Sequence, residues 1–221
     1  MRTVISVTDV SVSFGEEQVL KQVSFEFKEG LIYGIVGNNG SGKTVLMKCI
    51  CGFLIPDSGQ ITVNYKRIGK DIDFPEDTGL IIETPGFLPN MTGYKNLEIL
   101  APLRRKIGKD AIERTLQKVG LDPKLKKTVA KYSLGMRQRL GIAQAIMEDP
   151  SLLILDEPFN GLDKKGVAQM HQLILELRSQ NKTIILSSHG QNDIDVLCDV
   201  VCEMDGGMLR CVRTRRQQEM A

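Results

Sequence analysis

Apolar and polar side chains alternate over residues 4–13 and 18–27, on either side of the segment 14–17. A period of two places the apolar side chains of a strand on one face, so this pattern predicts an antiparallel pair of strands with one buried face. A continuous apolar run follows at residues 31–36 and predicts a buried strand. Residues 60–65 come directly after a Pro-Asp-Ser-Gly turn and resemble another strand.

The pattern becomes helical between about residue 92 and residue 149. Two sets of apolar residues recur there at helical spacing: Leu97, Leu100 and Leu103, and then Ile112, Leu116 and Val119. We interpret this segment as a helical insertion and expect a helical subdomain at about residues 90–149.

Strands and helices alternate after this insertion. Residues 152–155 and 183–186 are apolar runs typical of buried strands, and residues 164–179 between them carry an apolar stripe at helical spacing. Such alternation predicts parallel strands. The predicted fold class is therefore α/β, with a mostly parallel core sheet, an N-terminal antiparallel β-subdomain and the helical insertion.

Composition narrows the class of protein. The chain has 221 residues, 42% of them hydrophobic, so we expect one domain over residues 1–221. Lysine and arginine number 29 against 27 aspartate and glutamate, which gives no reason to expect a nucleic-acid partner. No apolar stretch approaches the roughly 18 residues that cross a bilayer, and no signal-like N-terminus is visible, so we expect a cytosolic protein.

The cysteines leave a metal site open as an alternative. Cys198 and Cys202 have a spacing that could suggest metal. However, the chain has only two histidines, His171 and His189, and no second cysteine pair lies at zinc-finger distance. Buried reduced thiols are the better interpretation of the five cysteines.

A glycine-rich segment lies between the strand at 31–36 and a stretch compatible with a helix. It reads Gly-Asn-Asn-Gly-Ser-Gly-Lys-Thr over residues 37–44. Its glycines allow backbone N–H groups to converge on one anion, and the helix that begins here aims its positive end at it. Lys43 adds a charge near the β- and γ-phosphates, and Thr44 offers a hydroxyl to Mg²⁺. The alternative is an ordinary turn. The expected nucleotide contacts are Gly37, Asn38, Asn39, Gly40, Ser41, Gly42, Lys43, Thr44 and Val45.

Two adjacent carboxylates follow the apolar strand at 152–155. Ligand sites of open α/β sheets lie at the carboxyl ends of the strands. Asp156 is a candidate to hold Mg²⁺, and Glu157 a candidate to polarise the water that attacks the γ-phosphate. Taken alone, the pair could also be a strand that ends in a polar turn.

Three further segments have a fixed order around this strand: Tyr132 to Gln138 before it, Asn160 to Asp163 after it, and Ser187-Ser188-His189 after the next strand. Together with the glycine-rich segment they resemble the ABC ATPase family, over nearly the whole chain. In that resemblance residues 132–138 are the signature motif, residues 160–163 the D-loop, and His189 the switch histidine. The fold that it implies is a P-loop NTPase of the ABC ATPase type.

The resemblance also implies how the site works. It implies ATP and Mg²⁺ as cofactors, catalytic roles for Lys43, Glu157 and His189, and ATP contacts from Ser133, Gly135 and Asp163. The signature of one subunit would complete the ATP site of another, with two ATP molecules between two chains in a homodimer or a heterodimer. Each segment also has a structural interpretation, because Ser133 and Asp163 suit helix N-caps and His189 could be a structural histidine.

The chain departs from the family pattern at two positions. Most ABC domains have a glutamine at the end of the strand near residues 80–82, whereas this chain has Glu83, which makes Glu83 a candidate metal ligand. A surface glutamate is the alternative. The signature reads Ser-Leu-Gly-Met. With the segment Glu83 to Phe87, it resembles the bacterial exporter group associated with bacitracin and lantibiotic resistance.

The adenine base usually stacks on an aromatic residue of the first hairpin in this family. Phe14 is the candidate because it precedes the turn at Gly15. A core phenylalanine at the end of a strand is the alternative.

These features favour an ATP-hydrolysing subunit that drives a separate transmembrane permease, as part of an exporter. Such a subunit would be peripheral on the inner face of the cell membrane. Two alternatives stay open: an ATP-dependent regulatory clamp on a membrane protein, and a soluble ABC protein that acts on the ribosome or on DNA. We expect no nucleic-acid partner.

Overall fold

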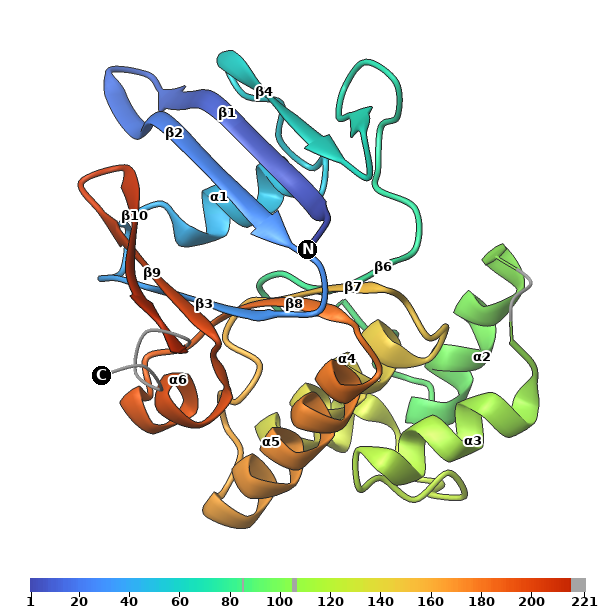
Figure 1. Cartoon of the computed structure of the whole chain (residues 1–221). Coiled ribbons are helices and arrows are strands. Elements are labelled where there is room, and N and C mark those ends of the chain that lie inside the picture. Colours follow the sequence, from blue (N-terminus) through green and yellow to red (C-terminus); the bar gives the residue numbers. More distant parts are fainter. Residues whose placement is uncertain (85, 105–106, 216–221) are drawn as a thin grey trace.

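The structure is a computed structural model that describes residues 1–84, 86–104 and 107–215 (Figure 1). Its first sheet is antiparallel and has the strand order β2-β1-β4-β5. The strands are β1 (Thr3–Phe14), β2 (Glu17–Lys28), β4 (Ser58–Val63) and β5 (Lys66–Arg67). β1 pairs with β2 as the alternating pattern predicts, and β4 begins and ends two residues earlier than expected.

The second sheet forms the core and has the order β10-β9-β3-β8-β7-β6. Its strands are β3 (Ile32–Val36), β6 (Thr78–Ile81), β7 (Leu152–Leu155), β8 (Thr183–Ser187), β9 (Val200–Asp205) and β10 (Met208–Thr214). All neighbours pair in parallel except β9 and β10. The mostly parallel core sheet is therefore confirmed.

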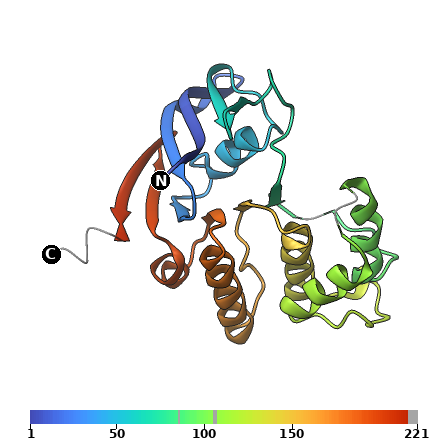
Figure 2. The same ribbon diagram turned by 45° about the vertical axis from the view of Figure 1, so that its right-hand side comes forward.

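Helices cover both faces of the core sheet (Figure 1). α1 (Lys43–Ile50) lies between the two sheets, and the other helices lie on the opposite face. They are α2 (Gly93–Arg104), α3 (Lys109–Lys118), α4 (Leu134–Ile146), α5 (Lys164–Ser179) and α6 (Gln191–Leu197), with a 3₁₀ turn at Val129–Lys131. Figure 2 shows α2 and α3 standing to one side, away from the antiparallel sheet.

The predicted apolar stripe of α2 is correct only in part. Leu97 is fully buried, but Leu103 is 77% exposed. Six residues correspond to about one and two-thirds turns of helix, so Leu103 falls on another face than Leu97. Ala101, which is four residues beyond Leu97, takes the buried position instead.

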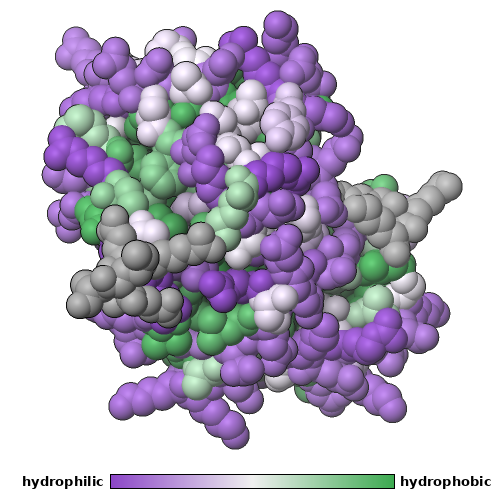
Figure 3. All heavy atoms as spheres, in the orientation of Figure 1, coloured by the Kyte–Doolittle hydropathy of each residue, from purple (hydrophilic) through white to green (hydrophobic). Residues whose placement is uncertain are grey.

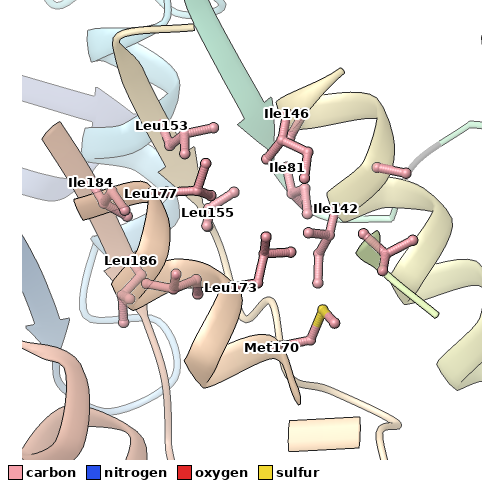
Figure 4. Close-up of a cluster of buried hydrophobic side chains, with 14 of the residues drawn as sticks. Ile81, Ile142, Ile146, Leu153, Leu155, Met170, Leu173, Leu177, Ile184 and Leu186 are labelled. Carbon is pink, nitrogen blue, oxygen red and sulfur yellow. The ribbon is translucent and has the colours of Figure 1, made fainter. Parts of the chain in front are cut away.

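Each face of the core sheet packs its own hydrophobic cluster. Because side chains alternate along a strand, Leu153 and Leu155 of β7 face α4 and α5, whereas Leu152 and Ile154 join the cluster around α1. Figure 4 shows Leu153 and Leu155 among side chains of the helices, including Ile142. One strand thus anchors both layers, and its carboxyl end is fixed from both sides.

Four cysteines are buried free thiols, as expected: Cys49, Cys51, Cys198 and Cys202. The prediction is wrong for Cys211, which is exposed because it lies on the edge strand β10. No helix of the described residues is both long and apolar enough for a bilayer crossing.

Candidate functional site

The glycine-rich segment forms a loop between β3 and α1. Gly37, Gly40 and Gly42 have φ values of 148°, 78° and 108°, which glycine adopts without the strain that a side chain would cause. A Cβ at Gly37 would also lie 2.2 Å from the Met204 carbonyl oxygen. Gly42 is the N-cap of α1 and has no side chain to occupy the first N–H groups of the helix. These groups therefore remain available to an anion.

Two polar side chains of this loop fit an anionic ligand. Lys43 is only 7% exposed, and its Nζ donates to the carbonyl oxygens of Gly37 (2.8 Å) and Asn38 (3.0 Å). Ser41 Oγ is buried and has no hydrogen-bond partner among the described residues. A buried hydroxyl without a partner is costly, so phosphate oxygens would satisfy a donor that the loop itself leaves unpaired.

The loop meets the first carboxylate of the β7 end. Thr44 Oγ1 donates to Asp156 Oδ2 over 2.7 Å, and Ser187 Oγ donates to Asp156 Oδ1 over 2.6 Å. Asp156 is 8% exposed, so these two hydroxyls hold a largely buried carboxylate. Hydroxyl and carboxylate oxygens are the donors that Mg²⁺ prefers, and the residue pair Thr44 and Asp156 fits that ion.

The second carboxylate faces the predicted switch histidine. Glu157 Oε1 lies 3.3 Å from His189 Nε2, and the two side chains are 20% and 52% exposed. The Glu157 backbone has a φ of 49° and is held by two hydrogen bonds, from its N–H to Ser187 Oγ (2.9 Å) and from Gln138 Nε2 to its carbonyl oxygen (3.1 Å). The backbone of Glu157 is therefore held in place, and its partly exposed carboxylate is open to a water molecule.

These groups line a cavity of about 370 Å³. Its described lining consists of Phe14, Glu17, Val19, Asn39, Gly40, Ser41, Gly42, Lys43, Thr44, Val45, Asp156, Glu157 and His189. The structure therefore brings the glycine-rich loop, both carboxylates and the histidine together. Phe14 is 54% exposed at this cavity, so it is no core residue and its ring is free to stack on a base.

A larger cavity of about 680 Å³ lies beside β10. Two of its cations, Lys28 and Arg178, already pair with the carboxylates of Glu26 and Asp199, and a third, Arg215, donates to the carbonyl oxygens of Asp195 and Val196. The chemistry predicted from the sequence lies in the smaller cavity.

The predicted signature segment does not reach the cavity of its own chain. Ser133 is exposed and is the N-cap of α4, where its Oγ accepts from the Met136 N–H over 3.2 Å. Gly135 packs on the segment at 160–163, since a Cβ there would lie 2.7 Å from the Gly161 carbonyl oxygen. None of residues 132–138 belongs to the described lining of the cavity.

Asp163 behaves in the same way. It is the N-cap of α5, and its Oδ1 accepts from the Gly166 N–H over 2.8 Å. Its structural interpretation is therefore confirmed, and the residue lies outside the described lining of the cavity.

Glu83 is not brought together with Thr44 and Asp156. Its side chain is 64% exposed and forms an ion pair with Lys48 Nζ at 2.6 Å. The described lining of the cavity does not include it, and no group of three or more His, Cys, Asp and Glu side chains within residues 1–84, 86–104 and 107–215 is arranged to hold a metal. Pro85, in the segment that follows, lies outside the described residues.

The roles of Ser187 and Gln138 were missed by sequence reasoning. Ser187 is the last residue of β8, next to β7 in the sheet, and a polar residue at that end of a parallel strand was an available signal. Gln138 lies on α4, far from Glu157 in the sequence, so no local pattern indicated its contact with the Glu157 carbonyl oxygen.

Comparisons with known proteins agree with this geometry. A family model described as ABC transporter matches residues 20–160. The chain is 42% identical over 205 residues to an uncharacterized ABC transporter ATP-binding protein, YybJ of Bacillus subtilis (strain 168), and the match covers 93% of this chain and 94% of that protein.

Two relatives have names that include a cargo. The bacitracin transport ATP-binding protein BcrA of Enterococcus faecalis is 42% identical over 213 residues, which cover 95% of this chain and 68% of BcrA. The lantibiotic transport ATP-binding protein SrtF of Streptococcus pyogenes is 33% identical over 198 residues, which cover 89% of this chain and 85% of SrtF.

Solved structures share the fold. An ATP binding subunit of an ABC transporter superposes with a TM-score of 0.85 at 28% identity, over 99% of this chain and 94% of that chain. A dimeric post-hydrolysis state of the ATP-binding cassette MJ0796, bound to ADP and Pi, superposes with a TM-score of 0.84 at 21% identity, over 95% and 99% of the two chains. At this lower identity the likeness concerns the fold alone.

Proposed function

The chain belongs to the ABC transporter family and is an ABC-type ATPase, and on this premise we propose that it is the ATP-hydrolysing subunit of an exporter of the bacitracin and lantibiotic kind. The observation that carries the proposal is the meeting of Lys43, Thr44, Asp156, Glu157 and His189 at one cavity. The names of the relatives BcrA and SrtF support the cargo class.

The residues divide the work by position. Lys43 and the N–H groups at the start of α1 bind the phosphates of ATP. Thr44 and Asp156 would hold Mg²⁺, which when bound neutralises phosphate charge. Glu157 orients the attacking water and accepts its proton, and His189, 3.3 Å from the carboxylate, fixes the direction in which that carboxylate points.

The signature residues act on a second chain in this proposal. Ser133 and Gly135 are at the exposed start of α4 and outside the described lining of their own cavity. The start of a helix binds anions, so these residues suit the γ-phosphate of ATP held by another subunit. Two chains would then enclose two ATP molecules, and hydrolysis would remove the contacts that hold the chains together.

A membrane permease is the partner that the proposal requires. Phe53 and Phe74 are 51% and 58% exposed, and their rings pack edge to face at 6.0 Å. Ile55, two residues after Phe53, is 56% exposed. An exposed apolar cluster of this kind is typical of a protein contact. Figure 3 shows the face of the molecule seen in Figure 1, where groups of hydrophobic residues lie among mostly hydrophilic ones. The subunit would lie on the inner face of the cell membrane.

Light scattering on the Glu157→Gln protein tests the proposal. The variant keeps its phosphate contacts and loses the base, so we expect a monomer without nucleotide and a dimer with ATP and Mg²⁺. The matched control, Lys43→Ala with Glu157→Gln, should stay monomeric because it binds ATP weakly. A Glu157→Gln protein that hydrolyses ATP like the wild type would contradict the role of the base.

A persistent monomer that binds ATP would contradict self-pairing and indicate a different ABC subunit as the partner. Mixing with a detergent-solubilised membrane fraction and isolating the tagged chain would then identify that partner.

A further inference from the structure

A buried histidine lies behind the two loops that carry Glu157 and His189. His171 belongs to the inner face of α5, is 8% exposed, and is no part of the described lining of the cavity. A buried polar ring of this kind is expected to have defined partners. One partner, Phe159, lies in the Glu157 loop, and the other, Asp193, lies in α6 directly after the His189 loop.

The first contact is with α6. His171 Nε2 lies 2.8 Å from Asp193 Oδ1, and Asp193 is itself 8% exposed. A carboxylate only accepts, so the imidazole carries a proton on Nε2 and donates it. The other oxygen, Asp193 Oδ2, accepts from Ser188 Oγ over 2.6 Å. The histidine therefore holds the carboxylate that holds the residue before His189.

The residue after His189 is tied to the same group. Gly190 donates its N–H to Ser188 Oγ over 3.0 Å, and its carbonyl oxygen accepts from the Asp193 N–H over 3.0 Å. A Cβ at Gly190 would lie 2.5 Å from Asp193 Oδ2. Both chain neighbours of His189 are therefore fixed by Asp193, while the His189 side chain itself is 52% exposed.

The second contact is with the loop that follows Glu157. The ring of Phe159 packs against the ring of His171, with centroids 5.0 Å apart and planes at 82°. Phe159 is 7% exposed and lies two residues after Glu157. One side chain of α5 thus supports the Glu157 loop by packing and the His189 loop by a hydrogen bond.

We propose that His171 is a positioning residue that sets the place of His189 relative to Glu157, through Asp193 and Ser188. This inference rests on the proposed ATPase mechanism, in which the Glu157 carboxylate and His189 must stay within contact distance. A displacement of about 1 Å in a catalytic group lowers rates by up to about 100-fold. His171 lies outside the phosphate loop, so its loss acts on turnover and leaves ATP binding largely unchanged.

Two variants separate the hydrogen bond from the packing. His171→Phe keeps a ring against Phe159 and removes the donor, whereas His171→Gln keeps a donor and removes the ring. We expect His171→Phe to lower kcat about tenfold, with KM for ATP within about twofold of the wild type. His171→Gln should retain at least half of the wild-type kcat. Wild-type kcat in His171→Phe, or equal losses in both variants, would overturn the proposal.

Hydrogen exchange gives a readout that does not depend on hydrolysis. In the protein without nucleotide, His171→Phe should speed amide exchange in residues 187–190. Leu177→Ala is a matched control at a buried position of the same helix. At a loss of melting temperature equal to that of His171→Phe, it should leave amide exchange in residues 187–190 unchanged. Unchanged exchange in His171→Phe would overturn the proposal, even if the wild type proved not to hydrolyse ATP and the proposed function were wrong.

A double variant tests whether His171 acts on the His189 loop through Ser188. Ser188→Ala cuts the link between Asp193 and the loop, so His171→Phe combined with Ser188→Ala should lose no more kcat than the stronger single variant. Losses that multiply would mean independent actions and would overturn the linked arrangement.

Discussion

In our proposal, the phosphate loop of one chain and the signature segment of a second chain bind the same ATP molecule. The two regions differ in how far their own chain covers them. The loop is closed by its own chain, because Lys43 is buried and donates to two carbonyl oxygens beside it. The signature segment is open, because Ser133 is exposed and satisfies only its own helix. The first region is preorganised within one chain, and the second has an exposed face that the proposed partner chain would cover.

The largest expected effect is on the chemical reactivity of the two buried thiols at the C-terminal end of α1, the helix that follows the phosphate loop. Burial raises the pKa of the Cys49 and Cys51 thiols to about 12. At pH 8 their thiolate fraction is then about 1000-fold below that of an ordinary thiol, and alkylation should be slower to a similar degree. A thiol titration should detect the exposed Cys211 in the native protein and all five thiols in guanidinium.

The same burial predicts a pH dependence of stability. Because the folded pKa of these thiols lies above the unfolded value, their contribution to the free energy of unfolding is fully present below about pH 9 and is lost as the pH rises toward 12.

In the thiol titration, Cys211→Ser is the control and should show no rapidly reacting thiol in the native protein. Rapid labelling of Cys49 or Cys51, located by peptide mapping, would mean that the buried end of α1 becomes accessible to solvent.

Lys43→Ala should have the next largest effect. A buried triphosphate loses a charged partner worth about 3 kcal/mol, so ATP affinity should fall about 100-fold. Isothermal titration measures this loss. Lys48→Ala, five residues further along α1, is the control, and equal affinity of Lys43→Ala and the wild type would place the phosphates elsewhere.

Ser133→Ala should act on the open region alone. The loss of the N-cap costs about 1 kcal/mol of stability, and ATP affinity of the single chain should not change. In the Glu157→Gln background, the ATP-driven dimer should weaken about tenfold, since a hydrogen bond to a charged phosphate is lost. Ser133→Thr retains the hydroxyl and is the control. A full-strength dimer in Ser133→Ala would separate this residue from the partner contact.

Lys48→Ala should have the smallest effect. Its ion pair with Glu83 is largely exposed, and such pairs contribute at most about 1 kcal/mol. Urea unfolding should therefore change little. The informative measurement is the Mg²⁺ dependence of hydrolysis, which should not change if Glu83 stays outside the cavity. If Lys48→Ala changes the Mg²⁺ dependence and the added substitution Glu83→Gln abolishes that change, Glu83 contributes to the cavity.

Sequence reasoning was most successful where one local pattern decides the structure. β7 and α5 have the predicted bounds because an uninterrupted apolar run and a helical stripe each have a single solution. The loop between β3 and α1 was predicted in its place because its glycines, Lys43 and Thr44 are contiguous between a strand pattern and a helix pattern. Leu103 failed because spacing alone does not say which residue of a wide stripe faces the core.

Contacts between distant segments were not readable. Nothing local to Ser187, Gln138 or His171 indicates their hydrogen bonds to Glu157 and Asp193, since these partners come from other segments. The same holds for Glu83, whose ion pair with Lys48 of α1 no local pattern indicated. The fold is encoded by patterns along the chain, and the fine adjustment of the site by pairs across it.

The hydroxyl of Ser187 constrains how the residues of the site can be substituted during evolution. It donates to Asp156 and accepts from the Glu157 N–H, so one mutation there disturbs both carboxylates at once. In the proposed mechanism, a substitution here would therefore alter the candidate metal ligand Asp156 and the candidate base Glu157 together. Gln138 donates to the Glu157 carbonyl oxygen from α4, so a substitution at Gln138 would act on Glu157 without removing a hydrogen bond of Asp156.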